Sequence, residues 1–115
     1  KLSVSVNAAE TVTVDLKELT KQVQEITRAT SHAQMLDDYQ YLICMDIERW
    51  KDDKEYVKLL RGYRIAIAGY IIRLGEILEQ IKADMTNPQL KKELVLISRK
   101  MSDLIDKLAK SVSGG

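Results

Sequence analysis

RGYRIAIAGYIIRLGEIL, residues 61–78, is the most apolar stretch of this chain. Between Arg64 and Arg73 lie eight uncharged residues, which span only about 12 Å of helix at 1.5 Å per residue. A membrane-spanning helix needs about 20 apolar residues, so the stretch is too short for an integral membrane span. Because its apolar residues would lie nearly all round a helix, we expect a core helix that is buried on several sides.

Three tyrosines mark one face of this central helix, which we expect to cover residues 53–85. Tyr56, Tyr63 and Tyr70 recur every seven residues, so their rings would lie along one stripe. Tyrosine is enriched in protein interfaces because it joins a large apolar ring to a polar hydroxyl. The stripe faces either the chain's own core or a second molecule, and the sequence leaves both open.

Small residues mark a second strip on the same helix. Gly62, Ala66 and Gly69 would form a smooth surface where another helix backbone can approach closely. Glycine inside a helix costs about 1 kcal/mol relative to alanine, so its presence here calls for a compensating contact. That contact is either internal to the chain or a seam with a second copy or another protein.

The last helix is expected over residues 88–112. Asn87-Pro88 predicts its start, with Asn as the N-cap and Pro at the first helical position. Apolar residues then alternate at spacings of four and three, which is typical of a coiled-coil seam. The seam consists of Leu90, Leu94, Ile97, Met101, Leu104 and Leu108.

The first helix is expected over residues 16–51. Asp15 and Glu18 fit a capping box at its start. Asp52 and Glu55 give the same pattern at the start of the central helix. Polar residues around Ser31 weaken the apolar periodicity, so the first helix either runs through this point or breaks into two.

Residues 1–14 differ from the rest of the chain, because β-branched residues alternate here with Ser and Thr. We expect an extended or β-hairpin-like N-terminal arm, then a helical bundle over residues 15–113 and a Gly114-Gly115 tail. Three long helices, or four if the first breaks near Ser31, need antiparallel neighbours along their length. The predicted fold class is therefore an all-α, elongated up-down antiparallel helical bundle.

The charge of the chain is balanced overall and uneven along its length. The formal net charge of the 115 residues is only +1, so no general basic excess points to nucleic acid. Residues 1–57 carry 7 Lys/Arg and 11 Asp/Glu (−4), whereas residues 58–115 carry 11 and 6 (+5). The two halves either compensate each other inside the bundle or present one signed face to a partner.

Residues suited to catalysis or metal binding are sparse. His32 is the only histidine and Cys44 the only cysteine, so one chain holds neither a paired-His metal site nor a disulfide. Cys44 lies in an apolar run, where we expect a buried structural thiol. The glycines do not form a phosphate-binding loop. We expect no enzyme activity and no cofactor.

These features favour a non-catalytic interaction or assembly domain that binds a second copy of itself or another protein. The contact would use the Tyr/Gly stripe of the central helix or the C-terminal heptad seam. A basic stripe on the central helix could also hold an anion or an acidic partner. It consists of Lys54, Lys58, Arg61 and Arg64.

Two other functions stay open from the sequence. One is a secreted membrane-active helical protein, such as a toxin or translocator component, with peripheral membrane contact. The other is a small-ligand binder with a cavity between its helices. The lone cysteine slightly favours a cytoplasmic location. Because the chain starts at Lys1 without an initiator Met, which fits a processed product, secretion stays open as well.

Overall fold

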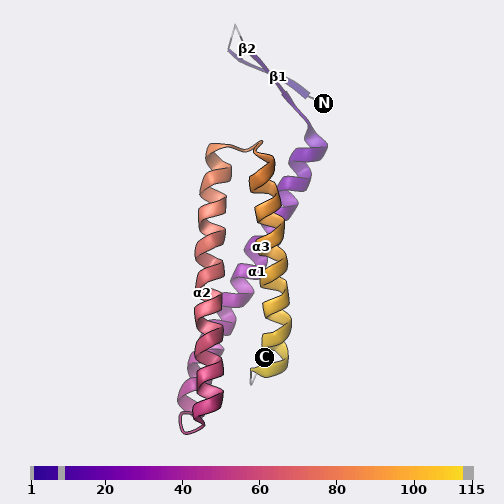
Figure 1. Cartoon of the computed structure of the whole chain (residues 1–115). Coiled ribbons are helices and arrows are strands. Elements are labelled where there is room, and N and C mark those ends of the chain that lie inside the picture. Colours follow the sequence, from indigo (N-terminus) through magenta and orange to yellow (C-terminus); the bar gives the residue numbers. More distant parts are fainter. Residues whose placement is uncertain (1, 8–9, 113–115) are drawn as a thin grey trace.

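The computed structural model describes residues 2–7 and 10–112, and the side chains of residues 15–112. It is an all-α bundle, in which the second and third helices form an antiparallel hairpin and the first crosses behind them (Figure 1). The chain measures 69 × 20 × 19 Å, so it is elongated. The three helices are α1 (Leu16–Arg49), α2 (Lys54–Ala83) and α3 (Pro88–Ser111).

Two strands precede the bundle, β1 (Leu2–Asn7) and β2 (Glu10–Val14). They pair antiparallel, with Val4 opposite Val12. The predicted Gly114-Gly115 tail lies outside the described residues.

α1 runs without interruption through Ser31, so the described part of the chain contains three helices and not four. The hydroxyl of Thr30 donates to the backbone carbonyl one turn earlier at 2.7 Å, which satisfies a polar side chain within the helix. Asp15 caps the start of α1, as predicted. Its carboxylate accepts hydrogen bonds from the backbone N–H groups of Lys17 at 3.1 Å and Glu18 at 3.3 Å.

α2 is capped by Asp53, whose carboxylate accepts a hydrogen bond from the backbone N–H of Tyr56 at 3.1 Å. The predicted capping box that starts at Asp52 is therefore wrong by one residue. The reason is the tight turn after α1, in which the N–H of Asp53 donates to the carbonyl of Trp50 at 2.9 Å. Asp52 is used inside this turn, so Asp53 becomes the residue that precedes the helix.

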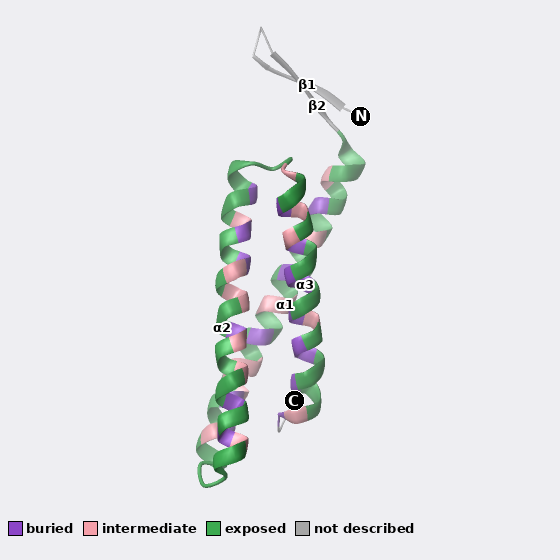
Figure 2. Cartoon of the chain, viewed as in Figure 1, coloured by how far each residue is buried: buried purple, intermediate pink, exposed green. Residues whose placement is uncertain are grey.

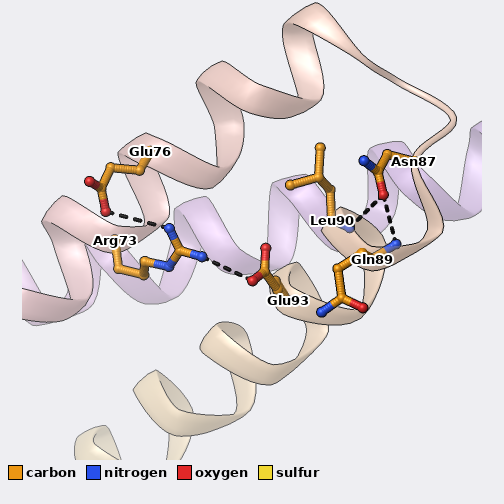
Figure 3. Close-up of polar contacts among 6 residues, drawn as sticks. All are labelled: Arg73, Glu76, Asn87, Gln89, Leu90 and Glu93. Atoms are coloured by element: carbon orange, nitrogen blue, oxygen red, sulfur yellow. Dashed lines mark hydrogen bonds and ion pairs between the residues drawn. The ribbon is translucent and has the colours of Figure 1, made fainter.

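α3 begins at Pro88, as predicted, and Asn87 is its N-cap. The Asn87 side-chain oxygen accepts hydrogen bonds from the backbone N–H groups of Gln89 at 2.9 Å and Leu90 at 3.4 Å (Figure 3). Farther along, Arg73 of α2 donates to Glu93 of α3 at 3.0 Å, and this ion pair bridges the two helices (Figure 3).

Each helix contributes one buried face to a core that runs the length of the bundle (Figure 2). In α1 this face carries Ala29, Leu36 and Ile43, which recur every seven residues. The heptad seam of α3 lies in the same core. Its buried residues are Leu90, Leu94, Ile97, Met101, Leu104 and Leu108.

Polar contacts join α1 to the rest of the chain at both of its ends. Near its start, the side-chain amide of the buried Gln22 donates to the backbone carbonyl of Met85 at 3.0 Å. Near its end, Asp46 is only 2% exposed and accepts a hydrogen bond from the hydroxyl of Tyr56 at 3.2 Å. The same hydroxyl lies 3.0 Å from the backbone carbonyl of Ser111, so all three helices meet at this point.

Candidate interaction surface

The central apolar stretch is buried on one side only. Ile67 is fully buried, whereas Ile65 is 75% exposed and Ile72 is 64% exposed. The expectation that this helix is buried on several sides is therefore wrong for the single chain. In a bundle of three helices each helix has only two neighbours, so one face of α2 is left to solvent.

This solvent face carries a regular row of residues, which we call the outer stripe. Its members follow one another at alternating spacings of four and three residues, so they lie along one side of α2. They lie on the side opposite the core residues Leu60, Ile67 and Leu74. The outer stripe consists of Lys58, Gly62, Ile65, Gly69, Ile72, Glu76 and Glu79.

The two glycines of the outer stripe are open. Apart from the adjoining residues and the backbone of its own helical turn, a Cβ atom added at Gly62 or Gly69 would meet no atom within 4 Å. Neither glycine therefore serves a close helix contact within the chain. Ala66 is instead partly buried against the core, so the predicted strip of Gly62, Ala66 and Gly69 does not form a single surface.

The three tyrosines face the chain's own core. Tyr56, Tyr63 and Tyr70 are all partly buried and pack against the core residues. Tyr56 also contacts Trp50, with ring centroids 6.4 Å apart in an edge-to-face arrangement. Of the two orientations left open by the sequence, the structure has the inward one.

The heptad seam of α3 is likewise occupied by packing inside the chain. Leu94, Ile97 and Met101 are buried in the core, and so are Leu104 and Leu108. A partner could reach these residues only if α3 left the bundle. Among the residues predicted to form a contact, the accessible ones are therefore Gly62 and Gly69 with the basic stripe.

The basic stripe lies along the N-terminal half of the same exposed face. Lys54, Lys58, Arg61 and Arg64 are all exposed. Two shallow depressions open beside them. One, of 370 Å³, is lined by Gln40, Arg61, Arg64, Ile65 and Ala68. The other, of 450 Å³, is lined by Glu55, Lys58, Leu59, Gly62 and Tyr63.

Cys44 is exposed, so the prediction of a buried thiol is wrong. The apolar run around it spans a full helical turn, and only part of a turn can face the core. Ile43 takes the buried position, while Tyr41 and Met45 are exposed with Cys44.

His32 and Ser98 form the one contact in the described chain that resembles a base and a nucleophile. The Nδ1 atom of His32 lies 3.2 Å from the Oγ atom of Ser98. Ser98 is only 3% exposed, so its hydroxyl is almost entirely covered although both residues border a surface depression of 220 Å³. The contact therefore satisfies a buried hydroxyl between α1 and α3. Within residues 2–7 and 10–112, no cluster of three or more His, Cys, Asp or Glu residues could hold a metal ion.

Sequence reasoning missed the buried polar residues of α1, although the signal for them was present. Leu36 and Ile43 are seven residues apart on the core face. Continuing the same repeat backwards reaches Gln22, and one step of three residues forwards reaches Asp46. A polar residue in a core position predicts a specific hydrogen-bond partner, and both residues have one.

None of the helices in the described part of the chain combines the length and apolar character needed to cross a membrane. Comparisons with protein-family models, with curated proteins and with solved structures found no match to this chain.

Proposed function

We propose that this chain is a non-catalytic protein–protein interaction domain, and that its contact surface is the outer stripe of α2. The observation that carries the proposal is the exposure of Ile65 and Ile72 on one face of a long helix. Single exposed apolar residues are normal on a protein surface. Here two large β-branched residues are seven apart in one row, and Leu59 is exposed on the same helix.

The cost of the glycines supports the same proposal. Each glycine inside a helix costs about 1 kcal/mol relative to alanine. At Gly62 and Gly69 no neighbouring atom of the chain occupies the space a methyl group would fill. A contact from outside the chain is what would use that space. Binding of a second helix along such a row is a common mode of recognition, with anchors spaced three, four and seven residues apart.

Site-specific photo-crosslinking in cells that produce the protein tests this function. The photoreactive amino acid benzoylphenylalanine replaces Ile65 in one variant and Asp106, which is exposed on α3, in a control. We expect a discrete crosslinked product from position 65 and none from position 106. If both positions gave the same products, or if position 65 gave none, the outer stripe would not be a contact surface.

A further inference from the structure

We infer that the outer stripe binds the outer stripe of a second copy of this chain, with the two α2 helices antiparallel. This inference rests on the interaction surface proposed above and names the partner that fits it. Two properties of the stripe carry the inference, namely the order of its large and small residues and the order of its charges.

The large and small residues of the stripe are complementary to themselves when the direction is reversed. From Gly62 to Ile72 the stripe alternates between glycine and isoleucine. In an antiparallel pair, setting Ile65 opposite Gly69 of the second copy also sets Ile72 opposite Gly62 of that copy. Each isoleucine then meets a position that has no side chain. The depression beside Gly62 gives such an isoleucine room to pack.

The charges of the stripe are complementary in the same alignment. Lys58 lies at its N-terminal end, with Arg61 exposed beside it, whereas Glu76 and Glu79 lie at its C-terminal end. The alignment that pairs isoleucine with glycine also sets Lys58 opposite Glu76 of the second copy. A parallel pair would instead set each charged residue beside its own copy, and like charges repel.

Nothing within the described chain accounts for this order of charges. Among the described residues Lys58, Arg61 and Glu79 form no ion pair within 4.0 Å, and Glu76 pairs only with Arg73 of its own helix, at 3.6 Å. The helix dipole favours the reverse order, with acidic residues near the N-terminus and basic residues near the C-terminus.

The end turns of α2 do follow the dipole. Glu55 lies in the first turn and Lys82 in the last turn, which are the signs that the dipole favours. The effect of the dipole is confined to these turns, so it leaves the interior charges unexplained. Arg73, the last basic residue before Glu76, forms an ion pair with Glu93 of α3 at 3.0 Å.

A second copy fits these observations better than a different protein because one surface supplies both halves of each complementary pair. An interface with two-fold symmetry uses the same patch on both molecules, so each favourable contact occurs twice. Within the outer stripe Ile65 and Ile72 lie between the charged residues at its two ends, and an apolar centre with a polar rim is the usual arrangement of an interface.

Sedimentation equilibrium of the purified full chain at low salt is the first test. We expect a dimer at concentrations of about 0.5 mM or below, which corresponds to a submillimolar dissociation constant. The double variants Lys58→Glu/Arg61→Glu and Glu76→Lys/Glu79→Lys should each self-associate at least about tenfold more weakly. An equimolar mixture of the two should recover dimers. The control Asp103→Lys/Asp106→Lys on α3 should behave as the unmodified chain, and circular dichroism should show equal helix content throughout.

Disulfide crosslinking tests the direction of the helices, in chains that carry Cys44→Ser. A mixture of Gly62→Cys and Ile72→Cys chains should form a mixed disulfide, because those positions face each other in the antiparallel pair. Gly62→Cys alone should crosslink poorly, because its two copies would be about 15 Å apart along the helices, beyond the reach of a disulfide.

Two results would overturn the inference. One is a monomer at about 0.5 mM, which would place the dissociation constant in the millimolar range or above. The other is efficient crosslinking of Gly62→Cys with itself, which would indicate parallel helices. If the purified chain were monomeric and the photoreactive residue at position 65 still crosslinked to another protein in cells, a second copy would be excluded as the partner. The proposed function would then stand.

Discussion

Tyr56 belongs to α2, yet its hydroxyl lies between groups of the other two helices. Asp46 of α1 and the carbonyl of Ser111 in α3 are 3.2 and 3.0 Å from the same oxygen. The carboxylate oxygen and the carbonyl oxygen are both hydrogen-bond acceptors, so the single hydroxyl proton is placed between two oxygens. A buried carboxylate needs such donors, because its desolvation is costly unless hydrogen bonds replace the lost water.

Replacing Tyr56 with Phe should destabilise the bundle by about 1.5–3 kcal/mol, the usual range for a hydrogen bond to a charged group. The substitution keeps the ring and removes only the hydroxyl, so it takes one donor from a carboxylate that is nearly inaccessible to water. Urea denaturation followed by circular dichroism measures the change in the free energy of unfolding.

Tyr63→Phe is the matched control, because Tyr63 is partly buried on the same helix and no hydrogen bond of its hydroxyl was found among the described residues. We expect its unfolding free energy to change by less than about 0.5 kcal/mol. Equal effects of the two substitutions would show that the Tyr56 hydroxyl contributes nothing specific.

For single residues, the sequence shows which side chains are apolar but does not predict which of them are buried in the core. Cys44 and Ile43 are neighbours in one apolar run, and only Ile43 is buried. The side chain that faces the core depends on the rotation of α1 against its neighbours, which is a property of the packed bundle. For the same reason the sequence alone could not show that Tyr63 faces the core and that Gly62 faces the solvent.

The helix ends depend on local chemistry, and most of them could be predicted. Asp15 and Asn87 cap α1 and α3 where the sequence indicated, because a short acceptor side chain before a helix binds the free N–H groups of its first turn. The start of α2 was misplaced because two aspartates are adjacent there. The choice between them is made by the turn after Trp50, which the capping pattern does not describe.

Asp53→Ala should therefore lower the free energy of unfolding by about 1 kcal/mol, whereas Asp52→Ala should change it by less than about 0.5 kcal/mol. Both residues are exposed aspartates at adjacent positions, so removing a negative charge should have the same general effect in each variant. A difference between the two variants therefore reports the N-cap. Thermal denaturation of the two variants in parallel gives the comparison. A larger loss in Asp52→Ala would mean that Asp52 is the N-cap after all.

At the scale of the whole molecule, the core of the bundle is formed by one buried face from each of the three helices. The approximate length of the helices could be predicted from the apolar periodicity and the breaks near Trp50 and Asn87. Their number stayed open between three and four, because only the packed structure shows that α1 continues through Ser31. The burial of α2 could not, because an apolar residue such as Ile65 looks the same in the sequence whether its own chain or another one covers it. The same limit applies to the candidate site. Its glycines were predicted to need a close contact, but the sequence did not show whether that contact lies inside the chain or with another molecule.

The two faces of α2 should respond differently to the same truncation. Ile67→Ala removes a fully buried side chain and should cost about 2–5 kcal/mol, including the cavity it leaves. Ile65→Ala, only two residues away, should change the unfolding free energy by less than about 0.5 kcal/mol. The measurement is chemical denaturation at a protein concentration low enough to keep the chain monomeric, since association would add stability.

A large loss of stability in Ile65→Ala under these conditions would contradict the one-sided burial of α2. A large loss seen only at high concentration would instead report association through the outer stripe.

The polar contacts of α1 have a consequence for how the helices align along their length. An apolar seam that repeats every seven residues looks nearly the same after a helix slides by one repeat, which is about 10.5 Å. The pairs formed by Gln22, His32 and Asp46 do not repeat, so a helix shifted by one repeat would separate these polar groups from their partners. A core of hydrocarbon alone would hold the helices together without fixing their offset, and these three side chains select one alignment.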